Sequence, residues 1–193
     1  MESQSCGFDF TAAMRCLCQD MTTRLPELCH IDLQHVAISI CQTRSEGSHG
    51  TYATLTPLRF EAGAPTKEVR GRRYGVEPVL SDSGSEFLYI LSFYLPRFLN
   101  TPLEENLSTV IHELWHISPE FDGDLRRHEG RCYAHGPSQQ AYDAQMDRFA
   151  QQWLALDPPE HLYDFLMGSF DDLLAEHGGV TGSHWQAPKL IPL

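Results

Sequence analysis

The sequence predicts a single α+β domain, in which a small, mainly antiparallel sheet packs with several helices. The chain has 193 residues, of which 41% are hydrophobic, so one sizeable core can form. Some segments repeat apolar residues at three- and four-residue steps, which is typical of amphipathic helices, whereas others are short β-branched or aromatic runs typical of strands. No internal repeat divides the chain. We therefore expect residues 1–193 to form one domain.

The N-terminal part combines one helix with two strands. Apolar residues recur at helical spacing from Phe10 to Leu28, and Pro26 favours the end of that helix. Residues 35–43 are rich in β-branched side chains, and residues 51–60 alternate in places between apolar and polar. Because turn-forming residues separate these two segments, we interpret them as a hairpin.

Residues 61–86 are rich in Gly, Pro and Ser and lack sustained periodicity, so we expect a long, mobile loop. Its arginines at 70, 72 and 73 predict an exposed basic loop, with a docking patch for an acidic partner as the alternative. The run FLYILSFYL, Phe87–Leu95, is apolar and aromatic almost throughout. It favours a buried strand at or near the centre of the sheet.

Three helices are expected in the second half of the chain. Thr101 can cap the first, with Pro102 at its first position and Glu104 bonding back to the cap. A second apolar stripe covers residues 138–156, and a third helix is expected over about residues 160–176. The tail, residues 180–193, shows no periodicity and is expected to be irregular.

Charge and composition exclude several classes of protein. Lys and Arg number 14 and Asp and Glu number 26, so the net charge of −12 argues against nucleic acid as a partner. No apolar run is long enough to span a bilayer, and the N-terminus lacks the pattern of a secretory signal. The six cysteines form no Cys-x-x-Cys pair. We expect free thiols in a cytoplasmic protein, with a disulfide framework or a second metal site as the alternatives.

The strongest chemical signal is the HExxH pattern His112-Glu113-Leu114-Trp115-His116, which lies within the first expected C-terminal helix. Side chains four residues apart share one helix face, so both imidazoles can bind one ion while Glu113 projects beside them. Neutral imidazoles favour zinc, and catalytic zinc sites usually take three protein ligands and a water. Pro119 and Asp122 occupy the positions where an extended HExxHxxGxxH motif would need Gly and His.

A third ligand is therefore sought further along the chain. His128 lies 12 positions after His116, and His135 lies 19 positions after it. His128 stands in a polar run that is typical of an exposed loop. An acidic residue on the next helix, such as Asp143 or Asp147, is a further alternative.

The residues around His135 resemble those of a known family. The sequence His135-Gly136-Pro137-Ser138, followed by Tyr142 and Met146 on a helix, is similar to the element that carries the third histidine in SprT-like (Spartan-type) metallopeptidases. The wider sequence also resembles small metallopeptidases of phages and bacteria. The resemblance covers about residues 87–156.

The resemblance implies a minimal zincin-like domain with the HExxH helix at its active site. It implies that His112, His116 and His135 bind Zn²⁺ and that Glu113 is the general base. A peptide or protein substrate is the corresponding expectation. Zinc lowers the pKa of its bound water, and the glutamate would take that proton and later deliver it to the leaving amine.

Other parts of the mechanism have several candidates. A donor to the oxyanion could come from Arg131, Tyr133, Tyr142 or His184. The strand Phe87–Leu95 could offer an edge to an extended peptide substrate.

Two alternative functions keep the zinc but not the peptidase activity. One is a zinc hydrolase that acts on a non-peptide amide or small molecule, which predicts a deep, closed pocket. The other is a catalytically inactive zinc-binding interaction domain, which predicts a closed site with four ligands. A structural zinc site does not need a glutamate, so Glu113 favours an enzyme.

The segment Phe121-Asp122-Gly123-Asp124-Leu125 has two aspartates and a glycine, as calcium loops do. The remaining ligand positions of such a loop are missing. We interpret the segment as a turn.

Overall fold

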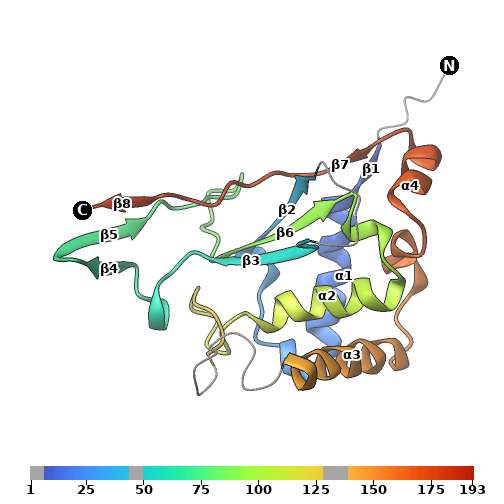
Figure 1. The fold of residues 1–193 in the computed structure, drawn as a ribbon, viewed down its shortest axis with the longest axis horizontal. Helices are drawn as coiled ribbons and strands as arrows, with labels where there is room; N and C mark the ends of the chain where they lie inside the picture. The colour runs from blue at the N-terminus through green and yellow to red at the C-terminus, as the bar shows by residue number, and fades with distance from the viewer. Residues whose placement is uncertain (1–6, 44–49, 128–138) are drawn as a thin grey trace.

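The computed structural model describes residues 7–43, 50–127 and 139–193, and within them it combines four α-helices with short β-sheets (Figure 1). The α+β class is therefore confirmed. The central sheet has the strand order β2-β6-β3, formed by Val36–Gln42, Tyr89–Leu95 and Ala53–Pro57 respectively. Strand β6 pairs in parallel with β2 and antiparallel with β3. The central sheet is thus mixed rather than mainly antiparallel.

Strand β6 is central, as the sequence predicts, but its position breaks the expected hairpin. The two segments assigned to that hairpin become β2 and β3, and β6 lies between them. Six of the seven residues of β6 are buried, so the strand is covered on both faces. A buried strand is most stable when another strand pairs with each of its edges. The pairing of β6 with both β2 and β3 therefore replaces the direct pairing of β2 with β3.

The central sheet contributes to two apolar cores. Ile38 and Leu91 point into the large core that also contains α1 (Phe10–Arg24) and α2 (Leu103–Trp115). Ala37 and Ile90, their neighbours in sequence, belong to a small core on the other face. This alternation is the ordinary two-residue period of a strand.

The helices α1, α2 and α3 (Gln139–Ala155) lie together below the sheet in Figure 1. Helix α1 contacts β2, α2 contacts β3, and α3 packs against α2. All three helices were expected from apolar periodicity. Helix α1 ends at Arg24, shortly before Pro26, as that proline predicts.

The expected capping box of α2 is wrong. Pro102 is the N-cap and makes no side-chain capping bond. The Thr101 hydroxyl instead donates to the Phe98 carbonyl at 2.8 Å and contacts Oδ1 of Asn106 at 2.6 Å. Asn106 is fully buried and also donates to the Thr101 carbonyl at 3.0 Å. Asn106, rather than Glu104, is therefore the helix residue that bonds back to Thr101.

The segment expected to be a long loop contains a hairpin. Strands β4 (Thr66–Val69) and β5 (Arg72–Val76) pair antiparallel, and Arg70 and Gly71 between them both have positive φ, at 52° and 73°. Two such residues are typical of a type I′ turn, which matches the twist of a hairpin. The expectation of a loop without regular structure is therefore wrong for residues 66–76.

The tail is also more regular than expected. Strand β8 (Leu190–Pro192) pairs antiparallel with β5, and this sheet projects away from the helices (Figure 1). Strand β7 (Val180–Thr181) pairs in parallel with β1 (Phe8–Asp9). Both pairings join segments that are far apart in sequence, so periodicity within the tail could not reveal them.

The last expected helix is interrupted. Helix α4 covers only Phe170–His177, with a capping box between Ser169 and Asp172, and it ends at Gly178 with φ of 72°. The preceding residues form two short 3₁₀ turns instead of an α-helix. The 3₁₀ turns of the described residues are Pro26–Leu28, Leu33–His35, Glu61–Gly63, Phe98–Asn100, Glu160–Leu162 and Asp164–Leu166.

Two expectations from composition can be compared with the described residues. Cys16, Cys18, Cys29 and Cys41 are free thiols, as expected. Burial raises the pKa of the Cys18 thiol to about 12, so this thiol stays protonated at neutral pH. Among the described residues, no helix has the length and apolar character needed to cross a membrane.

Candidate functional site

The HExxH residues lie at the C-terminal end of α2. His112 and Glu113 are in its last turn, and His116 is the C-cap. The Nε2 atoms of His112 and His116 are 3.0 Å apart, and their ring centroids are separated by 4.7 Å. Two nitrogens bound to one tetrahedral zinc at about 2.0–2.1 Å would lie about 3.3 Å apart. The two imidazoles therefore converge closely enough to share an ion.

Glu113 lies beside the histidine pair but is more deeply buried. Its exposed fraction is 8%, and no described residue forms an ion pair with it. Burial raises the pKa of Glu113 to about 7, although a hydrogen bond from the backbone of Leu55 opposes this rise. A carboxyl group with this pKa can both accept and return a proton near neutral pH.

The bond from Leu55 identifies the exposed edge of the sheet. Tyr94 donates its N–H to the Tyr52 carbonyl, and Leu58 donates to the Leu88 carbonyl. Since bonded residues alternate along an antiparallel pair, the backbone groups of Ala53 and Leu55 point away from β6. None of the described strands pairs with this outer edge of β3, so the edge is free except at the Leu55 N–H, which Glu113 already accepts. The expected edge at Phe87–Leu95 is wrong, because β6 is paired on both sides.

The third ligand is not placed by the structure. His135 and His128 both lie outside the described residues, as do Tyr133 and Arg131. Within residues 7–43, 50–127 and 139–193, no three His, Cys, Asp or Glu side chains form a group that could hold a metal. Asp143 and Asp147 are therefore not brought into such a group with the two histidines.

Tyr142 is the one candidate oxyanion donor that the described residues place at the site. Its ring centroid lies 5.0 Å from that of His112 and 6.0 Å from that of His116. Burial, and then the nearby Glu113 carboxylate, raise the pKa of the Tyr142 hydroxyl above its usual value. The hydroxyl therefore keeps its proton at neutral pH. His184 lies elsewhere, with Nδ1 at 2.8 Å from the Ile40 carbonyl on β2.

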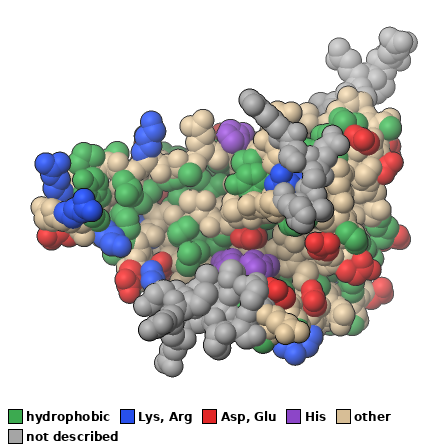
Figure 2. Space-filling view, viewed as in Figure 1, with side chains coloured by type: hydrophobic (Ala, Val, Ile, Leu, Met, Phe, Trp, Pro, Cys, Tyr) green, Lys and Arg blue, Asp and Glu red, His purple; other side chains and the backbone are tan. Residues whose placement is uncertain are grey.

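A cavity of about 690 Å³ adjoins the site. It lies between the start of β3, one face of α2 and one face of α3, and its described lining includes His112 and Glu113. Figure 2 shows histidines and acidic side chains close together on this part of the surface. The polar and charged lining residues from the two helices are Glu104, Glu105, Ser108, Thr109, His112, Glu113, Asp143, Asp147 and Gln151.

The chain after α2 is held against the end of that helix. Arg126 donates its backbone N–H to the His116 carbonyl at 2.7 Å and its Nε to the Trp115 carbonyl at 2.7 Å. Its guanidinium also lies over the Trp115 ring, 3.9 Å from the centroid. A cation at the last carbonyls of a helix is favourable because they carry partial negative charge. Arg126 lies two residues before His128, in the polar run that was expected to be an exposed loop, so this positioning role was missed.

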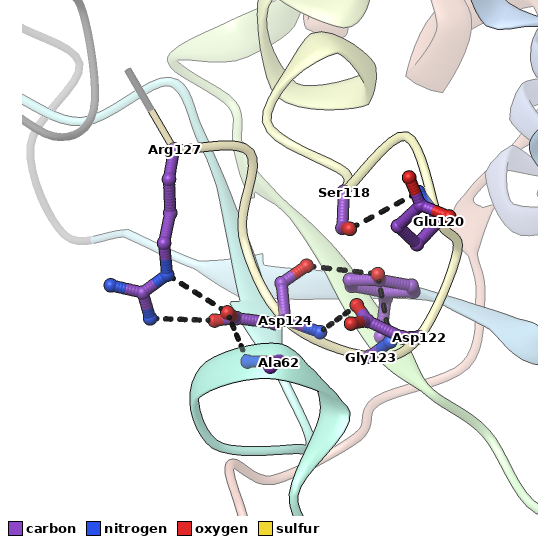
Figure 3. A network of polar contacts seen from close by, with 8 residues as sticks. Ala62, Ser118, Glu120, Asp122, Gly123, Asp124 and Arg127 are labelled. Carbon is purple, nitrogen blue, oxygen red and sulfur yellow. Dashed lines mark hydrogen bonds and ion pairs between the residues drawn. The ribbon is translucent and has the colours of Figure 1, made fainter. Parts of the chain in front are cut away.

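Asp124 fixes the turn that follows α2 (Figure 3). Its carboxylate accepts hydrogen bonds from Nε and Nη2 of Arg127, at 2.9 and 3.0 Å, and from the Ala62 backbone at 3.0 Å. Burial alone would raise the pKa of Asp124, but these bonds outweigh it and hold the pKa below its ordinary value. Protein donors thus occupy both carboxylate oxygens, and the segment forms a turn, as expected.

The hydroxyl of Tyr89 connects this turn to the central strand β6. It accepts the Gly123 N–H at 2.9 Å and donates to the Asp124 carbonyl at 2.9 Å. The same carbonyl also accepts the Ser118 N–H at 3.2 Å. The chain that leads from α2 toward residues 128–138 is therefore anchored to β6.

Comparison with known proteins finds no matching family model, and no curated protein or solved structure is significantly similar to the chain.

Proposed function

We propose that this protein is a zinc-dependent peptidase. The observation that carries the proposal is the convergence of His112 and His116 Nε2 atoms, 3.0 Å apart, beside the buried carboxyl group of Glu113. Glu113 is nine-tenths buried, and no described cation pairs with its carboxyl group. A helix that serves only to support the fold would not be expected to keep a glutamate at such a position. Such a group costs stability, which is typical of active sites.

The proposed zinc ligands are His112, His116 and His135. The separation of the first two nitrogens fits a shared ion, and neutral imidazole is a preferred ligand of zinc. Tyr142, seven residues after His135, contacts both rings, so the chain returns to the histidines shortly after the third proposed ligand. The resemblance to SprT-like metallopeptidases supports the same assignment.

Proton transfer and substrate binding are assigned to different parts of the chain. Zinc, when bound, would supply a Lewis acid that polarises the carbonyl group and acidifies water. Glu113 would accept a proton from the attacking water and pass it to the departing amine. The free edge of β3 would bind an extended substrate backbone beside Glu113.

The free strand edge favours a peptide over a small-molecule substrate. Ala53 lines the cavity, and its outward backbone groups can pair with another extended chain. A site for a small molecule has no need for such an edge.

The test is hydrolysis of a mixed peptide library, followed by mass spectrometry of the products. Zinc-loaded wild-type protein should cleave peptides, and Glu113→Gln should abolish cleavage while zinc remains bound. Retained cleavage in Glu113→Gln would overturn the role of Glu113 as the base. Loss of zinc from this variant would instead make Glu113 a ligand.

A further inference from the structure

The cavity beside the candidate site is strongly acidic. Helix α2 contributes Glu104 and Glu105 to its lining, and α3 contributes Asp143 and Asp147. No Lys or Arg is found among its described lining residues. In Figure 2, acidic side chains lie above and to the right of the central histidines, and a cluster of Lys and Arg lies at the far end, over β4 and β5.

The carboxylates of Glu104, Glu105 and Asp147 are available to a ligand. Glu104 and Glu105 are exposed, and neither they nor Asp147 form an ion pair with any described residue. Asp147 accepts a hydrogen bond from the Ser108 hydroxyl at 2.6 Å, which holds one of its oxygens between α2 and α3. A neutral donor orients this carboxylate without cancelling its charge.

A second observation also points to a cationic ligand. Glu113 also lines the cavity, is 8% exposed and has no cationic partner among the described residues. The carboxylates of Glu104, Glu105 and Asp147 reinforce one another in the cleft, because its low-dielectric walls focus their field. The cleft therefore attracts cations and repels anions.

We propose that this groove selects peptides that carry Lys or Arg side chains near the bond to be cleaved. The inference rests on the proposed peptidase function, to which it adds the class of substrate. The free edge of β3 would hold the peptide backbone, and the carboxylates of α2 and α3 would bind its basic side chains. An acidic peptide would be excluded by repulsion.

The geometry of α2 also gives the position of the basic residue. Glu104 lies eight residues before His112, which is about 12 Å along a helix that rises 1.5 Å per residue. Ser108, the partner of Asp147, lies one turn before His112, or about 6 Å. An extended peptide advances about 3.3 Å per residue. The carboxylates therefore face side chains about two to four residues from the cleaved bond.

The first test measures binding separately from hydrolysis. Fluorescence anisotropy would follow labelled peptides that differ only in carrying Lys, Gln or Glu at two adjacent positions, with the Glu113→Gln variant as receptor. The Lys peptide should bind at least about tenfold more tightly than the Gln peptide at low ionic strength, and the Glu peptide most weakly. Added salt should reduce the difference, because these carboxylates are near solvent.

The second test removes the groove charges by Glu104→Gln, Glu105→Gln and Asp147→Asn. The combined variant should bind the Lys and Gln peptides within about twofold of each other. A variant with Glu104→Gln and Glu105→Gln alone alters only exposed residues and keeps the Ser108 contact. This double variant should show a preference for the Lys peptide that is intermediate between those of the wild-type groove and the combined variant. Because it alters only exposed side chains, its loss of preference cannot come from misfolding.

A matched control makes the same change in net charge elsewhere. Glu68, Glu77 and Asp82 are exposed and do not line the groove, so Glu68→Gln, Glu77→Gln and Asp82→Asn should leave the Lys preference intact. Equal loss in the control would mean that overall charge, not the groove, attracts the peptide, and would overturn the inference.

The outcomes also separate this inference from the proposed function. Equal binding of all three peptides, or cleavage without preference for basic residues, would overturn the groove assignment alone. A Lys preference in binding without hydrolysis by zinc-loaded wild-type protein would overturn the peptidase proposal and leave a binding groove for cationic peptides.

Discussion

In metal-free protein, Glu113→Gln should stabilise the fold at neutral pH. Burial raises the pKa of Glu113 from 4.5 to about 7, so the unfolded chain loses this proton at lower pH than the folded one does. Between these values the folded state binds more protons, and stability falls as pH rises. One pKa unit corresponds to 1.36 kcal/mol, so the total loss is on the order of 3 kcal/mol. Gln does not titrate and avoids this loss.

The assay is urea unfolding of chelator-treated protein at several pH values between 4.5 and 8. The free energy of unfolding of Glu113→Gln minus that of the wild type should grow with pH and level off above about 7. Glu120→Gln, which alters an exposed residue, should show no such growth. A difference that stays constant with pH, or a variant that is less stable at every pH, would refute the reasoning.

Two further predictions concern the turn after α2. Tyr89→Phe removes the hydrogen-bond partner of the buried Gly123 N–H and should lower the free energy of unfolding by about 2 kcal/mol. The control Tyr94→Phe, on the same strand, should change the free energy of unfolding little. Equal effects of the two substitutions in urea unfolding would contradict this prediction. Because the pKa of folded Asp124 is depressed, its contribution is present above the ordinary pKa of an aspartate and is lost as pH falls below it. Asp124→Asn should therefore be clearly less stable than the wild type at pH 7, with the gap narrowing toward pH 3, and a gap independent of pH would exclude the charged contact with Arg127.

Local patterns predicted the elements that rely on local contacts. Helix α1, helix α3 and the buried strand β6 follow from apolar spacing within one segment, because that spacing sets which side chains reach the core. The mixed central sheet could not be found in this way. The parallel pairing of β2 with β6 and the antiparallel pairing of β8 with β5 both depend on contacts between distant segments.

The candidate site was likewise predictable only where it depends on local sequence. Four-residue spacing on a helix was enough to bring His112 and His116 together. The burial of Glu113 depends on strand β3, whose Leu55 backbone lies against it, and no feature of the HExxH motif encodes that neighbour. The acidic groove likewise arises only when α2 packs on α3, because each helix supplies part of its charge.

The most direct test of the account is the zinc content of protein purified without added metal. Elemental analysis should find about one zinc per chain in the wild type and in Glu113→Gln. His112→Ala and His135→Ala should lose it, whereas His128→Ala should retain it. Loss of zinc from His128→Ala but not from His135→Ala would exchange the roles of these two histidines. A wild-type protein that binds no zinc even after reconstitution would contradict the central claim.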